Sequence, residues 1–284
     1  MSEKTKIGLW DSNFPDAPSS VMGKESKYIE YVRNPMEFDG VVIFTDEHIN
    51  ADHVDQVQCK HKIGWLHEPF CLHPQTYARS LDNRRKFDAI MTYYKPLLDG
   101  YPGYVFAPYA GVWIPRSEWG MKPKTKNISM LIGKKMSTDG HLIRHKIVEL
   151  LNRNGFEVDY YGAYGEPVDY SWQTKYKVLA DYRYSIVSET CMEDNLFTEW
   201  LLDCFAVGTI PIFWGCPNVG DFFDDAGVLS FSDANDVAFI YPYLNEKHYT
   251  YLRHHAINNL KLIDRYEVSD DWFFKNVLEG KYLS

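Results

Sequence analysis

The sequence predicts an α/β protein of two domains, and three observations support this fold class. Short apolar runs rich in β-branched residues alternate with polar segments of helical spacing, which is typical of parallel sheets covered by helices. The alternation occurs twice, before and after a basic segment at residues 116–126 that follows Pro115 and contains Pro123. The chain has 284 residues, enough for two domains of ordinary size.

The first half contains the pattern of one parallel sheet. Continuous apolar runs predict strands at residues 6–10, 41–45, 62–66, 89–93 and 104–106, and a polar segment predicts a helix at 74–85. We therefore place an N-terminal α/β domain at residues 1–120.

The second half repeats this organisation. Strands are predicted at residues 128–132, 158–162, 184–188, 209–214 and 227–231, and helices at 142–152, 175–181, 198–206 and 219–223. These elements predict a second α/β domain at residues 121–262. The remaining residues, 263–284, predict a helical tail that can pack back on the first domain.

Charge and hydropathy exclude several classes of protein. The net charge is -9, which opposes the basic surface that nucleic-acid binding requires. The first ten residues have no apolar signal core, and no apolar run approaches the ~20 residues of a membrane-spanning helix. We expect a cytoplasmic protein without a transmembrane segment and without a nucleic-acid partner.

Glu68 is the first candidate for a functional residue. Ligands of parallel sheets bind outside the carboxyl ends of the strands, and Glu68 follows the predicted strand at 62–66. A carboxylate there can accept the proton of an attacking hydroxyl group. A solvated or helix-capping carboxylate explains the residue equally simply, and the sequence alone favours that explanation.

A second candidate region follows the first strand of the second domain and contains Lys134, Lys135 and Arg144. A helix N-terminus and nearby cations stabilise the charge of a departing diphosphate, and an arginine in the first helical turn can bind a phosphate bidentately. The segment has no glycine-rich phosphate motif, so a solvated helix face is the alternative.

A third region, residues 188–200, is rich in carboxylates. Glu189 follows a predicted strand and Glu199 opens a predicted helix. Carboxylates accept hydrogen bonds from the hydroxyl groups of ribose or another sugar, although helix electrostatics also explains Glu199. Glu193 and Asp194 allow a metal site, but their spacing matches no standard metal-binding loop. We expect no metal ligands.

Three motifs of the second half occur together in one order. They are Glu189-Thr190, Phe197-Thr198-Glu199, and the proline-containing apolar strand with the residues after it, Thr209–Val219. Over residues 176–237, the motifs and their separations resemble the C-terminal half of the family 10 glycosyltransferases, the α-1,3/1,4-fucosyltransferases.

Two upstream segments are similar to the same family. Ile143-Arg144 resembles the start of its arginine-bearing helix, and residues 65–69 stand where the family has a strand that ends in its proposed catalytic-base glutamate. The resemblance therefore implies that Glu68 is the base and that Arg144 contacts the donor phosphates.

The resemblance implies a GT-B fold, in which two Rossmann-like domains face a central cleft. It implies a single displacement with inversion at the sugar carbon, and no metal or other cofactor. The donor would be a GDP-sugar, with Glu199 near the ribose, Thr198 in the same donor-binding motif, and Glu189 at the donor sugar or shaping its pocket. The acceptor would be a glycan or glycolipid bound by the N-terminal domain.

The chain departs from the family pattern at three positions. Trp200 replaces a lysine that contacts the donor phosphate in relatives, Leu196 replaces a tyrosine, and Thr190 replaces an asparagine. Basic residues of the second region, Lys134, Lys135 or Lys146, are candidates to supply the missing charge. Otherwise the donor differs from GDP-fucose, or the chain is inactive.

Two other functions stay open at this point. One is a catalytically silent module that binds a nucleotide-sugar or a glycan, which Trp200 favours. The other is a metal-dependent transferase of another fold that uses Glu193 and Asp194. Aromatic residues are candidate acceptor platforms, although ordinary core packing explains each of them as well: Trp65, Tyr93, Tyr94 and Tyr109.

Overall fold

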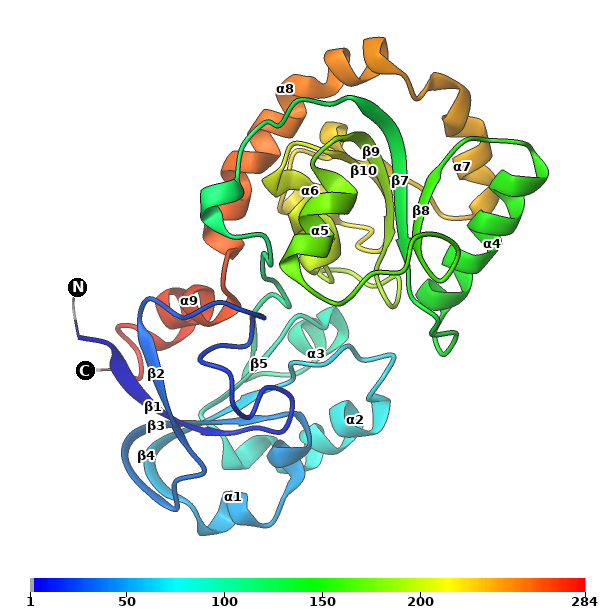
Figure 1. Cartoon of the computed structure of the whole chain (residues 1–284). Helices are drawn as coiled ribbons and strands as arrows, with labels where there is room; N and C mark the ends of the chain where they lie inside the picture. The colour runs from blue at the N-terminus through cyan, green and yellow to red at the C-terminus, as the bar shows by residue number, and fades with distance from the viewer. Residues whose placement is uncertain (1–2, 284) are drawn as a thin grey trace. The chain divides into compact units, whose positions relative to one another are not determined.

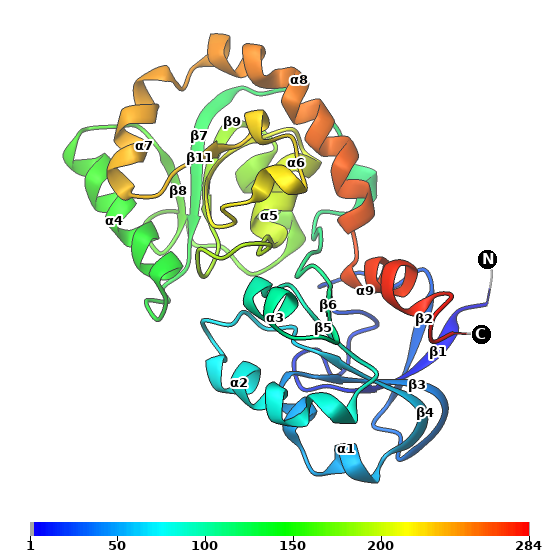
Figure 2. The same ribbon diagram turned by 180° about the vertical axis from the view of Figure 1, so that it is seen from behind.

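The computed structural model describes residues 3–283 and forms two compact units. The first unit extends to Gly111 and resumes at Tyr266, and the second is Val112–Arg265. Each unit has one sheet in which every strand pairing is parallel, with helices packed on the sheet (Figures 1 and 2). The predicted α/β class with two Rossmann-like units is confirmed.

The sheet of the first unit has the order β2-β1-β3-β4-β5-β6. Its strands are β1 (Thr5–Trp10), β2 (Ile29–Arg33), β3 (Glu37–Thr45), β4 (Gln58–Trp65), β5 (Ala89–Thr92) and β6 (Tyr104–Phe106). Its helices are η1 (Asp46–Asn50), α1 (His53–Gln56), α2 (Pro74–Asn83), η2 (Arg84–Lys86) and α3 (Lys95–Gly100). The sequence missed β2, because this edge strand is only partly buried and carries charged residues.

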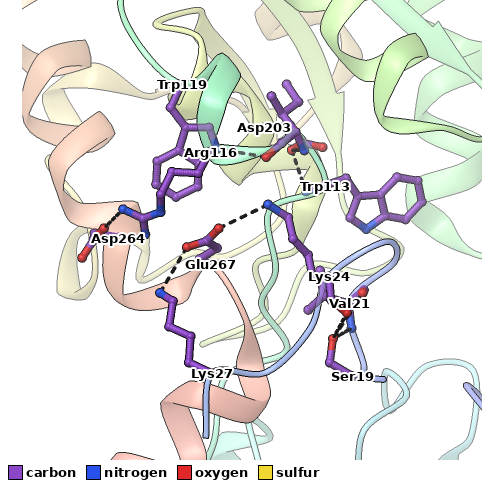
Figure 3. Close-up of polar contacts among 11 residues, drawn as sticks. Ser19, Val21, Lys24, Lys27, Trp113, Arg116, Trp119, Asp203, Asp264 and Glu267 are labelled. Carbon is purple, nitrogen blue, oxygen red and sulfur yellow. Dashed lines mark hydrogen bonds and ion pairs between the residues drawn. The ribbon is translucent and has the colours of Figure 1, made fainter. Parts of the chain in front are cut away.

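The C-terminal segment belongs to the core of the first unit. It forms α9 (Ser269–Phe273) and the π-helical turn η8 (Phe274–Leu278), and Phe273 packs edge-on against Trp65 with the ring centroids 4.9 Å apart. Glu267, just before α9, pairs with Lys24 at 3.3 Å and with Lys27 at 3.5 Å, as Figure 3 shows. Residues far apart in the sequence therefore complete one core.

The sheet of the second unit has the order β11-β10-β9-β7-β8. Its strands are β7 (Lys126–Ile132), β8 (Asp159–Gly162), β9 (Tyr182–Ser188), β10 (Ile210–Trp214) and β11 (Leu229–Ser230). Its longer helices are α4 (Asp139–Arg153), α5 (Trp172–Leu179), α6 (Glu199–Ala206), α7 (Ala234–Ile240) and α8 (Glu246–Leu262). Its short helical turns are η3 (Arg116–Glu118), η4 (Val219–Asp221), η5 (Asp225–Gly227), η6 (Tyr241–Tyr243) and η7 (Ile263–Tyr266), the last of which leads back into the first unit.

Side-chain alternation along the strands of the second unit explains how helices cover both faces of its sheet. Ile128 and Met130 of β7 point into a core formed with α4, α7 and α8. Ser129 lies between them in sequence and therefore points to the other face. There its hydroxyl donates a hydrogen bond of 2.6 Å to the Val178 carbonyl of α5. Because all strand pairs of this sheet are parallel, the carboxyl ends of the strands lie at one edge.

Two of the proposed acceptor platforms belong to the core. Trp65 and Tyr93 are each 1% exposed, so they cannot present a ring face to a glycan. Tyr94 and Tyr109 are half-buried, which leaves the prediction for these two open. In addition, no helix within residues 3–283 is both long and apolar enough to cross a membrane.

Candidate functional site

The strand order of the second unit determines where a ligand can bind. All strands are parallel, but the order in which successive strands are added to the sheet changes side between β7 and β9. The second strand, β8, lies on one side of β7, whereas β9 and then β10 follow on the other side. In doubly wound sheets, the loops after the two central strands part at this point and leave a crevice. The residues that follow β7 and β9, Gly133 and Glu189, begin the candidate site.

A pocket of about 510 Å³ opens at this edge. Its wall includes glycines, apolar side chains, and two tryptophans, a tyrosine and two lysines: Gly133, Trp113, Trp200, Tyr170, Lys134 and Lys175. Mostly apolar pockets of this size with a few polar groups are typical of small-molecule sites.

Trp113 is held in the pocket wall by a buried acid. Asp203 of α6 accepts hydrogen bonds from the backbone N–H of Trp113 at 3.0 Å and of Ile114 at 3.1 Å (Figure 3). Asp203 is fully buried, and burial raises the pKa of its carboxyl group to about 7. Asp203 of α6 therefore fixes the backbone of Trp113, and with it this part of the pocket wall.

Arg144 lies on α4 beside the pocket and is 5% exposed. Its Nε donates a 2.7 Å hydrogen bond to the Ser188 hydroxyl, and an Nη donates to the Ser188 carbonyl. Its guanidinium carbon lies 4.8 Å from the centre of the Trp200 indole ring. Burial lowers the pKa of Arg144 and nearby Glu189 raises it, but an arginine stays charged at neutral pH.

The position of Arg144 within its helix differs from the prediction. Thr138 caps α4, and its side chain accepts the His141 backbone N–H, so the helix begins at Asp139. Arg144 therefore lies in the second turn, and the prediction of the first turn is wrong. The sequence placed the helix start at Leu142 because apolar periodicity does not include the polar cap and the residues directly after it.

Glu189 is 1% exposed, and both of its carboxylate oxygens contact Thr198. One accepts the Thr198 backbone N–H at 2.9 Å and the other accepts the Thr198 hydroxyl at 2.7 Å. Burial raises the pKa of Glu189 to about 7, and the charge of Glu199 adds to this rise. These contacts give Glu189 a role in shaping the loop before α6, and direct contact with a donor stays a prediction.

Two glycines make room for the Glu189 segment. A Cβ at Gly140 would lie 1.8 Å from the Glu189 carbonyl oxygen, and a Cβ at Gly215 would lie 2.6 Å from its Cγ. Larger residues at these positions would displace the start of α4 or the end of β10.

Thr198 and Glu199 form the start of α6. The Thr198 side chain caps the helix by accepting the Trp200 backbone N–H at 3.2 Å. The same hydroxyl group donates to Glu189, so it makes one hydrogen bond as a donor and one as an acceptor within the protein. Glu199 is the first helical residue, and its side chain is 16% exposed. The structure thus brings Arg144, Glu189, Thr198 and Glu199 together at one edge of the sheet.

Lys175 is a site residue that the sequence analysis missed. It lies on α5 and is 3% exposed, its Nζ lies 3.4 Å from the centre of the Trp200 ring, and 3.7 Å separates it from the Glu199 carboxylate. In the sequence, Lys175 is one of two lysines in a predicted helix and belongs to no recognised motif. The only hint was Trp200, which departs from the lysine of the family pattern that the motifs resemble.

The basic loop after β7 contributes less than predicted. Lys134 lies in the pocket wall, but its side chain is exposed. Lys135 and Lys146 are also exposed and are not part of the wall of this pocket. Donor binding by Lys134 and Lys135 stays a prediction.

The first unit contains the other candidate residue, Glu68, after β4. Asp46 accepts the backbone N–H groups of His67 at 2.8 Å and of Glu68 at 3.1 Å through one carboxylate oxygen. Its backbone φ is 41°, an uncommon left-handed conformation that aspartate tolerates better than most residues. Asp46 therefore fixes the backbone that carries Glu68.

Buried titratable groups surround Glu68. Burial raises the pKa of Asp46 to about 7, and the charge of Glu68 adds to the effect, while hydrogen bonds from His67 and Glu68 oppose it. Burial lowers the pKa of His67 to about 4. His67 is therefore neutral at pH 7, and its 3.8 Å approach to the Glu68 carboxylate is not a salt bridge there. Asp46 was missed although it follows a strand as Glu68 does.

Glu193 and Asp194 belong to no cluster of potential metal-binding side chains in the described part of the chain. Within residues 3–283, no group of three or more histidine, cysteine, aspartate or glutamate side chains is arranged to hold a metal ion. The side chains described here therefore offer no cluster that favours the metal-dependent alternative.

Comparison with known proteins gives a family match. Residues 121–274, more than half of the chain, match the family described as glycosyltransferase family 10 (fucosyltransferase), C-terminal part. No curated protein matches the full sequence in a direct search.

Solved structures are similar in fold. An α1,3-fucosyltransferase with GDP-fucose matches with a TM-score of 0.56 and 16% identity, over 100% of this chain and 94% of that chain. TarM from S. aureus matches with a TM-score of 0.59 and 13% identity, over 84% and 55% of the two chains. OtsA matches with a TM-score of 0.60 and 12% identity, over 87% of this chain and 74% of that chain.

Proposed function

Because the chain belongs to glycosyltransferase family 10, we propose that it transfers a sugar from a GDP-sugar to a hydroxyl group of a glycan or glycolipid. Its fold is of the GT-B type, as in the similar glycosyltransferase structures. The family match establishes a glycosyltransferase, and the donor, the mechanism and the acceptor are parts of the proposal.

One observation carries the proposed donor site. Arg144 is buried beside the pocket at the carboxyl edge of the second sheet, where two hydrogen bonds to Ser188 and the Trp200 ring hold its charge in place. A fixed cation needs no reorganisation when negative charge develops on a leaving diphosphate. In this proposal Glu199, next to Trp200, accepts hydrogen bonds from the ribose of the same ligand.

The proposed reaction is a single displacement. Glu68 accepts the proton of the acceptor hydroxyl while the oxygen of that group bonds to the anomeric carbon of the donor. The bond from this carbon to the diphosphate oxygen breaks on the opposite face, so the configuration inverts. The bonding electron pair leaves with the nucleoside diphosphate, whose charge the cations of the second unit stabilise.

We propose that the reaction needs no metal ion, because the buried cation of Arg144 beside the pocket can neutralise the diphosphate in place of a metal. Full activity in the presence of EDTA is the expected result. Loss of activity in EDTA with recovery on adding Mg²⁺ or Mn²⁺ would contradict this part of the proposal. The cytoplasmic location stays a prediction from the sequence.

Binding of nucleotides tests the donor class directly. GDP, UDP and TDP would be compared by calorimetry and by the shift of the melting temperature. We expect GDP to bind best and to stabilise the protein by about 2.7 kcal/mol at 100 times its dissociation constant. Tighter binding of UDP or TDP would change the donor class, and the absence of binding by all three would refute the donor site.

Trp200 favours one alternative, a catalytically silent binding module, because it removes a cation of the family motif. Incubation with GDP-fucose and related GDP-sugars separates the two functions. Release of GDP that Glu68→Gln abolishes supports an active enzyme. Binding of the donor without any GDP release or sugar transfer would support the module.

A further inference from the structure

The ammonium group of Lys175 is buried and its hydrogen-bonding capacity is unused. Among the described residues, no acceptor lies within hydrogen-bonding distance of its Nζ, although the residue is only 3% exposed. An ammonium group has three N–H donors, and burying them without acceptors is costly. A buried donor of this kind in a pocket wall indicates a ligand that supplies the acceptors.

The surroundings of Lys175 compensate part of its charge and hold it in place. The Nζ lies 3.4 Å from the centre of the Trp200 ring and 5.2 Å from that of Trp113, and Glu199 is 3.7 Å away. Aromatic faces stabilise a cation without accepting its N–H groups in conventional hydrogen bonds. The ammonium charge is thus compensated in part, while its directional donors stay available.

We propose that Lys175 binds the diphosphate of the donor, with Trp200 as the platform that positions it. Both Lys175 and Arg144 contact the Trp200 ring, so two cations converge on one indole. A ligand with two linked phosphates can pair one phosphate with each of the two cations, whereas a ligand with a single carboxylate cannot pair fully with both. The ammonium group of α5 therefore supplies the charge that the resemblance to the family leads us to expect at position 200, from a neighbouring helix.

This inference rests on the proposed donor site and makes it more specific. It replaces Lys134, Lys135 and Lys146 as the source of the missing charge, because their side chains are exposed whereas Lys175 is held inside the pocket wall. A ligand that carries a diphosphate and a nucleoside would pair the phosphates with Lys175 and Arg144. Its base would lie against the glycine-containing apolar wall.

A purely structural role for Lys175 makes a different prediction. The charge of Lys175 lowers the pKa of the buried acid Asp203, so the lysine could serve only to stabilise the fold. Its loss would then weaken the binding of every ligand of the pocket to a similar degree. A role in phosphate binding instead depends on the phosphates of the ligand.

The test compares GDP with guanosine in the 284-residue chain by calorimetry and ligand-observed NMR. In Lys175→Met, we expect GDP to bind 10- to 100-fold more weakly, the usual effect of losing a charged hydrogen bond. We expect guanosine affinity to change less than about twofold. The matched control is Lys177→Met, because Lys177 lies on the same helix and pairs with Glu166 at the surface. It should bind both ligands as the wild type does.

A rescue variant keeps the test decisive if Lys175→Met is unstable. Lys175→Met combined with Trp200→Lys returns an ammonium group to the same corner of the pocket, and GDP affinity should recover to within about tenfold of the wild type. A folded double variant without this recovery would contradict the proposal. So would wild-type GDP affinity in Lys175→Met, or equal weakening of GDP and guanosine. If the wild type binds no nucleotide, the proposed function itself fails.

Discussion

The two units build sheets with the same order of their first five strands, but they place different charged groups near the carboxyl ends of these strands. In both sheets the first strand lies between the second and the third, so each has a crevice at the same place. In the first unit, the residues that follow β3 and β4 include the acids Asp46 and Glu68. In the second, Arg144 and Lys175 gather around Trp200. The shared scaffold determines where a site forms, and the residues after the strands determine its chemistry.

The units also differ in how they hold their functional groups. Glu68 is fixed through its backbone, which Asp46 binds from a left-handed conformation. Arg144 and Lys175 are fixed through their side chains, by an aromatic ring and by Ser188. We therefore expect changes in the first unit to affect proton transfer and changes in the second to affect donor affinity.

Glu68→Gln should give the largest effect and tests this division of roles directly. Glutamine keeps the shape of the side chain but cannot accept the proton, so kcat should fall about 10²- to 10⁴-fold. GDP affinity should stay within about twofold of the wild type. A variant that keeps wild-type kcat, or that loses GDP affinity instead, would contradict the assignment of the base.

Arg144→Ala is the counterpart in the second unit. The loss of a buried charged donor should weaken GDP binding about 10- to 100-fold, measured by calorimetry. The variant should also be less stable by about 1–3 kcal/mol, since the Ser188 groups lose their buried partner. The control is Arg153→Ala, on the exposed face of the same helix. Unchanged GDP affinity in Arg144→Ala would remove the central argument for the donor site.

Asp46→Ala sharpens the comparison in the first unit. It removes the acceptor for two backbone N–H groups and places alanine at a positive φ, so the Glu68 backbone should shift and kcat should fall about tenfold. Asp46→Asn keeps an acceptor oxygen and tolerates this conformation, so it should retain most of the activity. GDP affinity should not change in either variant. Equal losses in the two variants would indicate a role for the Asp46 charge rather than for positioning.

Asp203→Asn tests how a buried acid supports the pocket of the second unit. The folded-state pKa of Asp203 is about 7, above the value of about 4 for an unfolded chain. The folded state therefore holds a proton that the unfolded state releases, and this stability is present below pH 4 and lost as the pH rises to 7. Relative to Asp203→Asn, the unfolding free energy of the wild type should fall by up to ~1.4 kcal/mol per pH unit in this window.

Urea unfolding at several values between pH 4 and pH 7 would measure this difference. Asp181→Asn, at an exposed position of the same unit, should show no such slope relative to the wild type. If the stability difference between Asp203→Asn and the wild type does not depend on pH, Asp203 is ionised in the folded protein throughout this range.

The smallest effect is expected from the exposed lysines after β7. Lys134→Ala should weaken GDP binding by at most about fivefold, because an exposed charge contributes ~0.2–1 kcal/mol. Lys135→Ala should change it less than twofold, since its side chain is not part of the pocket wall. A loss of tenfold or more in either variant would show that the loop after β7, rather than Lys175, supplies the cation.

Apolar periodicity predicted most of the elements correctly, including the strands that become β1, β3, β4, β7 and β9. It missed β2, whose five residues include the charged Glu30 and Arg33, and it placed the start of α4 too late because the cap and the residues directly after it are polar. The rule that functional residues follow strands selected Glu68 and Glu189, and the same rule applied to β3 would have selected Asp46.

The sequence by itself determined the α/β class, the family, and the positions of Glu68, Arg144 and Glu199 after strands or on helices, because these features depend on local pattern and order along the chain. Only the tertiary structure decided which charges meet. Lys175 and Trp200 are separated by a strand and a loop, and their contact depends on how α5 and α6 pack on the sheet. Local periodicity records which face of a helix is buried, but not which side chain of another helix it will meet there.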